Sequence, residues 1–459
     1  MRGEISRRQC LHIGSTAFGS LAWAALQGHA QVARGMDRAP NAARLAPRAK
    51  RVIFLFMNGG PSQHDMFDYK PELAKRSGQT GLDKKKPLIG PITTFAQHGN
   101  SGQWISDFLP HLANQADQLC VIRSMQTNSS AHPLAIPLLH TGSFQFTRPS
   151  MGSWILYGLG TENKDLPGYI SINPTRTFGG PSNYGSAFLP SNFQATRIGW
   201  QGKSLRDATI ENIGPDGAPT TTAKRQVELS QMLNRSLLAR GQAIHSVRGA
   251  LDSLDLSLRM EAVVPHVMNL GEETVDTLSM YGIDQKPTDN FARQCLLARR
   301  FAEAGVRFIQ LTHGGWDHHS NLNKKLPDRC ADIDKPIAAL LTDLKQRGML
   351  EDTLVLWIGE FGRQPDTQIL NGKLADGRDH NAKGYCAWLA GGGVREGISH
   401  GATDELGYEA VENQVHLYDL QATILHLVGL DHTKLTYRYS GRDFRLTDVH
   451  GQVVHDILT

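Results

Sequence analysis

Cysteine is scarce in this chain of 459 residues and widely scattered. Of the five cysteines, Cys10 lies close to the N-terminus, and the others are Cys120, Cys295, Cys330 and Cys386. This spacing contains no CxxC pair and fixes no disulfide pairing. Two of the four later cysteines lie within apolar, strand-like runs, which predicts buried thiols. A disulfide between two of them would require an oxidising compartment.

An excess of charge of one sign is also missing. The 48 Lys and Arg residues nearly balance the 44 Asp and Glu residues, so the formal net charge is only +4. No basic stripe with interleaved aromatic residues is present, and this excludes a nucleic-acid footprint. Beyond the first 30 residues no apolar run approaches the ~20 residues of a membrane span. The sequence therefore predicts a mature chain without a transmembrane segment.

The N-terminus has the pattern of an export signal. Ser6-Arg7-Arg8-Gln9-Cys10-Leu11 is a twin-arginine motif, a mildly apolar stretch follows, and Gly28-His29-Ala30 offers a cleavage site. We predict a signal peptide at 1–30 and twin-arginine export to the periplasm or the extracellular space. An ordinary amphipathic first helix is the alternative. Residues 31–50 are rich in Ala, Arg and Pro and predict a linker.

Short apolar runs in the remainder of the chain predict buried parallel strands. They lie at 52–57, 119–122, 308–311, 354–358 and 385–390. Apolar residues at helical spacing lie between them, at 291–304 and 332–347. Alternating strands and helices predict one α/β domain over 51–459, a three-layer sandwich with a mostly parallel central sheet.

The middle of the chain has a different composition. Residues from about 158 are rich in Gly, Pro, Ser and Asn with scattered aromatic residues, and 222–263 follow a long helical pattern. We interpret 158–286 as an insertion that covers the edge of the sheet, with capping of the site as a further role.

The most informative motif is Thr312-His313-Gly314-Gly315-Trp316-Asp317-His318-His319, directly after an apolar run. Ligands in open α/β sheets bind at the carboxyl ends of the strands. Asp oxygen and His nitrogen suit a borderline divalent cation such as zinc, manganese or iron. A polar surface loop is the alternative interpretation.

Four further polar clusters lie next to predicted strands. They are 58–65, 129–132, 360–363 and 377–381, and the last of these precedes its strand. Because parallel strands place their carboxyl ends along one edge, the clusters predict a shared site.

On these segments the chain resembles the twin-arginine-exported DUF1501 family, a branch of the alkaline phosphatase-like superfamily that also contains sulfatases. The resemblance covers essentially the whole mature chain. Its matching segments are 52–68, 132–142, 314–319, 359–362, 377–393, 401–405 and 419–425. It implies an alkaline phosphatase-like fold with one or two metals at the carboxyl edge of the sheet.

The resemblance also implies roles for individual residues. The metal ligands it implies are Asp317, His319 or His318, His380, Glu360 and Asp65. Glu360 has an alternative partner in the nearby Arg363, which we predict to clamp an oxyanion through two hydrogen bonds.

Three positions depart from the superfamily pattern. Asn58 replaces a metal-binding Asp, Phe361 replaces a metal-binding His, and His132 stands where a hydroxyl or thiol nucleophile is expected. These changes reduce a two-metal site to one metal at most. His132 is then a metal ligand, a general acid or base, a histidine nucleophile or a structural histidine.

The loop Asn58-Gly59-Gly60-Pro61-Ser62 predicts anion binding through Asn58, Gly60 and Ser62, since glycines allow close approach of the backbone. A tight turn with Ser62 capping a short helix is the alternative.

These features predict an exported metal-dependent hydrolase that acts on a phosphate or sulfate ester of a small molecule or glycan, through metal-activated water. The competing hypothesis is a non-catalytic periplasmic or cell-surface binding protein on the same fold. The sequence indicates no protein partner.

Overall fold

The computed structural model describes residues 45–83, 86–206 and 245–459, together with positions 208, 210, 229 and 232. The expected signal peptide at 1–30 and most of the expected linker lie outside the described residues. Within the described part of the chain, no helix is both long enough and apolar enough to cross a membrane.

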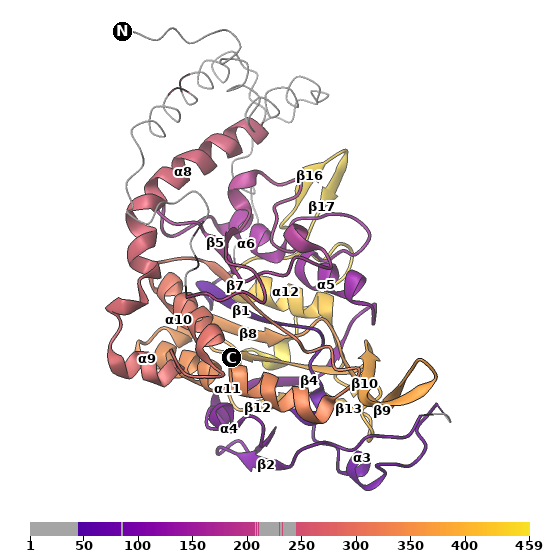
Figure 1. Cartoon of the computed structure of the whole chain (residues 1–459). Coiled ribbons are helices and arrows are strands. Elements are labelled where there is room, and N and C mark those ends of the chain that lie inside the picture. The colour runs from indigo at the N-terminus through magenta and orange to yellow at the C-terminus, as the bar shows by residue number, and fades with distance from the viewer. Residues whose placement is uncertain are drawn as a thin grey trace. The chain divides into compact units, whose positions relative to one another are not determined.

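One large sheet, flanked by helices, forms the centre of the domain (Figure 1). Its strand order is β12-β4-β11-β8-β1-β7-β5-β6, and β15 also pairs with β4. The strands are β1 (Arg51–Asn58), β4 (Cys120–Gln126), β5 (Tyr169–Ile172), β6 (Thr196–Ile198), β7 (Phe308–Gly314), β8 (Thr353–Ile358), β11 (Tyr385–Ala390), β12 (Ile398–His400) and β15 (Val415–His416). All five predicted strands are therefore confirmed.

The direction of one predicted strand was wrong. β11 pairs antiparallel with both β8 and β4, whereas the other pairings in the sheet are parallel. The reason is the connection between β8 and β11, a hairpin of β9 (Gly362–Leu370) and β10 (Lys373–Asn381). This hairpin returns the chain to the carboxyl edge of β8, so β11 begins at that edge.

The two faces of the sheet carry separate apolar cores. Ile53, Leu55 and Met57 of β1 belong to one core, and Val52, Phe54 and Phe56 belong to the other. The first core is covered by α4 (Pro110–Ala113), α8 (His245–Met268), α9 (Val275–Tyr281), α10 (Asp289–Glu303) and α11 (Leu322–Gln346). The second is covered by α5 (His132–Thr141), α6 (Met151–Leu159) and α12 (Leu417–Leu427). The predicted three-layer sandwich is confirmed.

The segment at 158–286, which we expected as an insertion, contributes to the sheet. β5 pairs with β7, and β6 extends the sheet beyond β5. The helical pattern of its second half corresponds in the described residues to α8, while most of 207–244 lies outside them.

Smaller elements surround the sandwich. They are α3 (Pro71–Lys75), β2 (Phe95–His98), β3 (Gln103–Ser106), β13 (Ala402–Thr403), β14 (Ala410–Glu412), β16 (Tyr437–Tyr439) and β17 (Arg442–Phe444).

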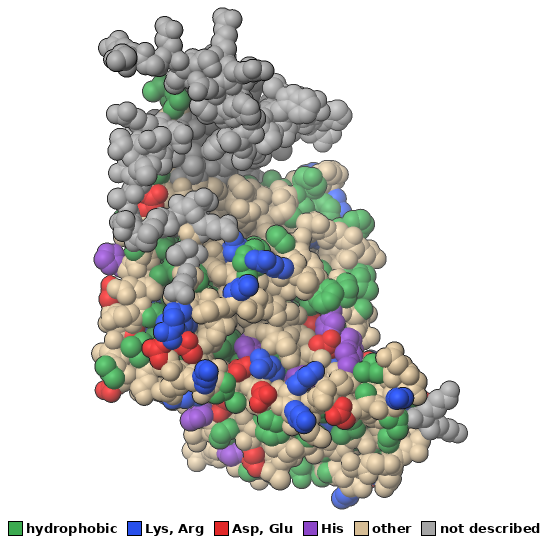
Figure 2. Space-filling view, viewed as in Figure 1, with side chains coloured by type: hydrophobic (Ala, Val, Ile, Leu, Met, Phe, Trp, Pro, Cys, Tyr) green, Lys and Arg blue, Asp and Glu red, His purple; other side chains and the backbone are tan. Residues whose placement is uncertain are grey.

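The cysteines Cys120, Cys295, Cys330 and Cys386 are all buried and free, as the apolar context of two of them indicated. Figure 2 shows basic and acidic side chains interspersed in a band across the viewed face.

A buried histidine lies inside the second core. His140 is 2% exposed and packs against Phe54 and Phe56. Its Nδ1 donates to the Ile136 carbonyl at 2.8 Å, and its Nε2 lies 3.1 Å from Gln310 Nε2. Burial lowers the pKa of His140 to about 4, so the ring is neutral in the folded protein.

This neutral histidine predicts loss of stability in acid. The unfolded ring has a pKa near 6.5, so stability is full above that pH and declines as the pH falls toward 4. We expect protonation of His140 to lower the free energy of unfolding by about 1.4 kcal/mol per pH unit in that window. Urea unfolding at several pH values should show a shallower decline for His140→Gln than for the parent. Equal slopes in the two proteins would contradict the assignment.

Candidate functional site

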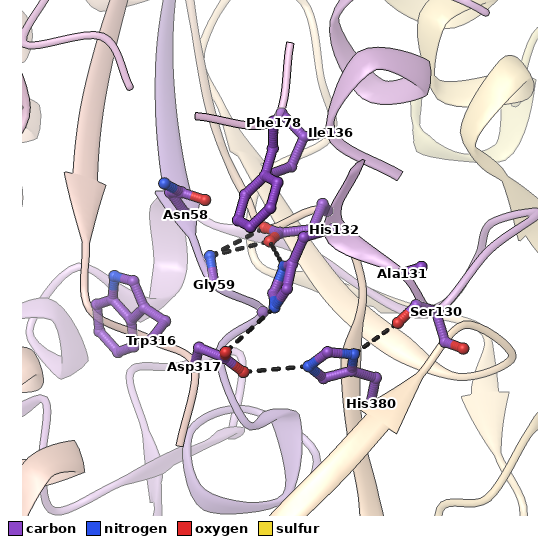
Figure 3. A network of polar contacts seen from close by, with 12 residues as sticks. Asn58, Gly59, Ser130, Ala131, His132, Ile136, Phe178, Trp316, Asp317 and His380 are labelled. Atoms are coloured by element: carbon purple, nitrogen blue, oxygen red, sulfur yellow. Dashed lines mark hydrogen bonds and ion pairs between the residues drawn. The ribbon is translucent and has the colours of Figure 1, made fainter. Parts of the chain in front are cut away.

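Residues from four segments meet at the carboxyl edge of the sheet (Figure 3). Asp317 and His319 follow β7, His132 is the first residue of α5, His380 lies in β10, and Glu360 follows β8. β10 returns the chain to this edge. His380 therefore reaches the site although it comes before β11, the next strand of the large sheet. The structure thus brings together side chains from the polar clusters that follow β4, β7 and β8 and from the cluster that precedes β11.

Asp317 is the centre of the cluster. Its Oδ2 lies 3.3 Å from His132 Nε2, and its Oδ1 lies 2.9 Å from His319 Nε2 and 3.1 Å from His380 Nε2. Arg363 Nη2 donates to the same Oδ1 at 2.6 Å. Burial alone would raise the pKa of Asp317. The histidines and Arg363 outweigh burial and hold the pKa of this carboxyl far below its usual range.

Each of the three histidines is held at its other ring nitrogen by an acceptor. His132 Nδ1 lies 2.6 Å from Glu360 Oε1, and His380 Nδ1 lies 2.6 Å from the Ser130 carbonyl oxygen. His319 Nδ1 contacts Gln368 Oε1. A carboxylate or carbonyl oxygen only accepts hydrogen bonds, so Nδ1 carries the proton in all three rings. In the neutral tautomer, each Nε2 therefore presents a lone pair to Asp317.

Three lone pairs around a carboxylate place acceptors against acceptors. Arg363 offsets part of the carboxylate charge through its bond to Oδ1, but the contacts between each Nε2 and the carboxylate still require a further cation. Two cations satisfy this requirement: a proton on an imidazole or a bound metal ion. Metal-ligating histidines commonly donate their remaining N–H to a carboxylate or carbonyl, as these rings do. The geometry therefore fits either a protonated histidine or a metal centre.

The ligand atoms of His132, Asp317 and His380 lie within 4.8 Å of one another, close enough to hold one metal ion. In a tetrahedral site with bonds of about 2.0–2.1 Å, ligand atoms lie about 3.3 Å apart. The His132 Nε2–Asp317 Oδ2 distance is 3.3 Å. His132 Nε2 is also buried and makes no hydrogen bond. These residues fit a divalent cation.

A proton occupies His132 when no metal does. Burial lowers the pKa of His132, but Asp317 and Glu360 outweigh burial and raise it to about 9. His380 has its pKa lowered, chiefly by burial. His132 is thus the ring that balances the negative charge in the metal-free protein.

Glu360 fixes the ring of His132 from behind. Its carboxylate is fully buried and accepts the Gly59 N–H at 3.0 and 3.1 Å. Gly59 has φ +126°, and a Cβ there would lie 2.6 Å from Asp317 N, so the turn requires glycine. Phe361 and Phe178 pack against the His132 ring at centroid distances of 4.8 and 5.5 Å. Glu360 contacts His132 rather than Arg363.

Arg363 lies beneath the site and is 1% exposed. Its Nε donates to the Gly60 carbonyl at 2.7 Å, and its Nη1 donates to the Arg378 carbonyl at 3.0 Å. Its Nη2 donates to Asp317, to the Gly59 carbonyl and to the Trp316 carbonyl. The guanidinium that we expected to clamp an oxyanion is therefore surrounded by protein acceptors and holds the loops that carry Asp317.

Two predicted metal ligands lie outside the cluster. Asp65 is fully buried and pairs with Arg378, at 3.0 Å from Nε and 3.2 Å from Nη2. His318 is 2% exposed, and burial lowers its pKa to about 4. The structure places neither side chain against Asp317.

The three predicted anion-binding residues also have partners within the protein. Asn58 Nδ2 donates to Gln201 Oε1 at 2.9 Å, and the Gly60 carbonyl accepts from Arg363. Ser62 precedes a short 3₁₀ turn, and its hydroxyl donates to Asp65 instead of capping the backbone.

Several members of the site leave no signal in the sequence. Gln368 and the Ser130 carbonyl orient two histidines, and Phe178 packs on a third. Ser130 lies next to His132 in a predicted cluster, but a backbone carbonyl leaves no mark in a motif. Gln368 and Phe178 lie in segments without any motif.

The hydrogen bonds from Arg363 to the loop carbonyls predict that removing this side chain lowers the free energy of unfolding strongly. Arg363→Met leaves several buried carbonyl oxygens without a donor, at about 1–3 kcal/mol each. We expect a loss of at least about 3 kcal/mol in the free energy of unfolding, measured with urea. Arg438→Met, which removes an exposed ion pair with Asp443, is the control and should cost less than about 1 kcal/mol. Equal effects would contradict the structural role of Arg363.

Several solved structures resemble the fold at low similarity. A sulfatase from Pseudoalteromonas sp. is 15% identical over 87% of this chain and 76% of its own, with a TM-score of 0.37. A lipoteichoic acid synthase from Listeria monocytogenes is 9% identical over 89% and 76%, with a TM-score of 0.39. An alkaline phosphatase from an Antarctic bacterium is 11% identical over 76% and 94%, with a TM-score of 0.32. Similarity at this level says nothing about substrate or activity.

A sequence comparison with curated proteins gave no match. The family model described as "Protein of unknown function (DUF1501)" matches residues 49–458. This match covers nearly all of the chain beyond the expected linker and confirms the resemblance to DUF1501. The chain belongs to the DUF1501 family.

Proposed function

We propose that this chain is an exported, metal-dependent hydrolase that cleaves a phosphate or sulfate ester with activated water. The observation that carries the proposal is the convergence of three histidine Nε2 atoms on the Asp317 carboxylate. Twin-arginine export fits this proposal, since that route carries folded proteins and often ones already loaded with a cofactor.

His132, Asp317 and His380 would hold the metal. A divalent cation bound there lowers the pKa of a coordinated water and polarises an ester oxygen. The mixed nitrogen and oxygen donors suit zinc, manganese or iron. Among the described residues, His132, Asp317 and His380 form one group of three ligands, and three protein ligands are typical of sites that leave a position for water or substrate.

The residues around the ligands hold them in the binding tautomer. Glu360 accepts the His132 Nδ1 proton, and the Ser130 carbonyl accepts that of His380. Both rings therefore direct unprotonated Nε2 atoms inward. Arg363 fixes the position of Asp317 from below.

His319 is available for proton transfer. Its Nε2 lies 2.9 Å from Asp317 Oδ1, and its side chain is 27% exposed, more than that of His132 or His380. We assign His319 the role of general base toward water, in place of the catalytic role expected for His132. With His132 as a ligand and no hydroxyl or thiol side chain at its position, the reaction proceeds without a covalent enzyme intermediate.

A non-catalytic binding protein remains the second candidate function. The observation that favours it is the imidazole of His132 at the position where the superfamily has its nucleophile. The two functions differ in turnover: a binding protein retains its ligand ester intact.

The catalytic proposal predicts slow hydrolysis of p-nitrophenyl phosphate or sulfate by protein loaded with zinc or manganese. Intact-mass spectrometry during turnover should show no phosphoryl or sulfuryl adduct. His319→Gln should lower kcat by about 10²–10⁴-fold, the usual contribution of a general base, while metal content stays unchanged.

His266→Gln is the matched control, because the His266 side chain is 79% exposed and far from the cluster in sequence. It should leave kcat unchanged. An unaltered kcat in His319→Gln would refute the assignment of His319. Absence of turnover with every metal and ester, in a folded and metal-loaded protein, would favour the binding protein.

The tautomer argument makes a separate prediction for Glu360. Glu360→Gln replaces an acceptor with an amide that can donate to His132 Nδ1, which moves the ring proton to Nε2. We expect a 10–100-fold loss of zinc affinity by calorimetric titration, as is usual for partners of metal ligands. Glu412→Gln, at an exposed position, should bind zinc like the parent. Equal affinity in both variants would contradict the role of Glu360.

A further inference from the structure

A cavity of about 390 Å³ lies at the end of β7. The segments that follow β5 and β6, the end of β7, and the helices α10 and α11 form its wall. None of the metal-ligand residues His132, Asp317 and His380 lines it. Its volume falls within the range of about 300–1,000 Å³ that is typical of small-molecule sites. The cavity is therefore a place of its own, which the proposed hydrolysis does not use.

Three side chains of the wall carry buried oxygen atoms without a partner. Asn173 Oδ1, Gln294 Oε1 and Thr312 Oγ1 make no hydrogen bond with any described residue. The three residues are 1%, 2% and 2% exposed. Asn173 and Thr312 are neighbours across two strands, because each directly follows a member of the Ile172–Leu311 pair. Since unsatisfied buried polar atoms are destabilising, a ligand that reaches them gains affinity.

These oxygens call for hydrogen-bond donors. Asn173 Nδ2 donates to the Lys203 carbonyl at 3.4 Å, so the other atom of this amide is an acceptor. An amide oxygen only accepts, and a hydroxyl accepts as well as donates. A primary ammonium group has three N–H donors and no acceptor, so one such group matches all three oxygens. A ligand hydroxyl supplies a single donor and matches them less well.

The charges of the wall balance. Arg329 Nη1 lies 2.7 Å from Asp332 Oδ2. His313 Nδ1 accepts the Trp316 indole N–H at 3.0 Å, so its Nε2 carries the ring proton, 3.2 Å from the same Asp332 oxygen. Burial lowers the pKa of His313, which keeps the ring uncharged at neutral pH. A lone ammonium would therefore stay uncompensated in this cavity, and burying an unpaired charge is costly.

Arg329 offers the place for a compensating carboxylate on the ligand itself. Its side chain is 35% exposed, whereas the three unpartnered oxygens are buried. A guanidinium has five N–H donors and binds carboxylates through paired hydrogen bonds. The side chain lies against Gly315, where an added Cβ would be 3.2 Å from Arg329 Cδ. Phe291 and Pro287 supply the apolar part of the wall.

We propose that this cavity is a second binding site of the chain and that it takes a free α-amino acid as a zwitterion. The ammonium group faces Asn173, Gln294 and Thr312, and the carboxylate faces Arg329. The amino-acid side chain packs against Phe291. This site is independent of the metal-ligand residues and does not rest on the proposed hydrolysis.

The test is calorimetric titration of the full chain with L-leucine, L-glutamine and L-serine, each measured separately. No metal is added, because amino acids chelate zinc. We expect at least one amino acid to bind. Its amide, which lacks the negative charge, and its N-acetyl derivative, which lacks the positive charge, should each bind at least about tenfold more weakly, because each loses a charge-assisted hydrogen bond.

Variants locate the binding. Gln294→Leu and Thr312→Val remove buried acceptors, and Arg329→Gln alters only the partly exposed rim and leaves the buried wall intact. Each should weaken the amino acid about tenfold. Arg438→Gln, whose side chain is 69% exposed in the β16–β17 hairpin, is the control and should bind like the parent.

Three results would overturn the proposal. They are absence of binding by all three amino acids, equal affinity for the amino acid and both derivatives, and equal affinity of the parent and Arg329→Gln. The first would mean that the cavity holds only water. Because the titration involves neither metal nor ester, its outcome is separate from that of the hydrolase assays.

Discussion

The site depends on one electrostatic constraint: the Asp317 carboxylate is surrounded by imidazole nitrogens that present lone pairs to it. Each ring is fixed in this tautomer by an acceptor at Nδ1, of which the buried Glu360 carboxylate is the strongest. Acceptors cannot face acceptors without a cation between them. The site therefore requires a cation. When no metal is bound, a proton on His132 supplies one at Oδ2, while the Nε2 atoms of His319 and His380 still face Oδ1.

The sheet supplies the positions that this constraint needs. Parallel strands β1, β7 and β8 deliver Gly59, Asp317 and Glu360 to one edge, as their common direction requires. The hairpin of β9 and β10 brings His380 back to that edge and at the same time makes β11 antiparallel. Arg363 then ties the loops together through the carbonyls of Gly59, Gly60 and Trp316.

Sequence patterns predicted the strands and the edge at which the site lies, because buried parallel strands are continuous apolar runs. They also identified Asp317, His132, His319, His380 and Glu360, which the structure brings together. They did not predict the direction of β11 or the burial of Arg363 and His318, since both depend on contacts between distant segments. The pairing of Asp65 with Arg378 spans 313 positions and leaves no local pattern.

The central claim is that a metal ion is the cation at Asp317 in the loaded protein, and its most direct test is anomalous diffraction at the zinc edge, from crystals of the protein grown with zinc. The account predicts one peak within about 2.0–2.1 Å of His132 Nε2, His380 Nε2 and an Asp317 carboxylate oxygen. Crystals grown with excess zinc that show no peak there would contradict it, because a proton would then be the only cation that the site takes up.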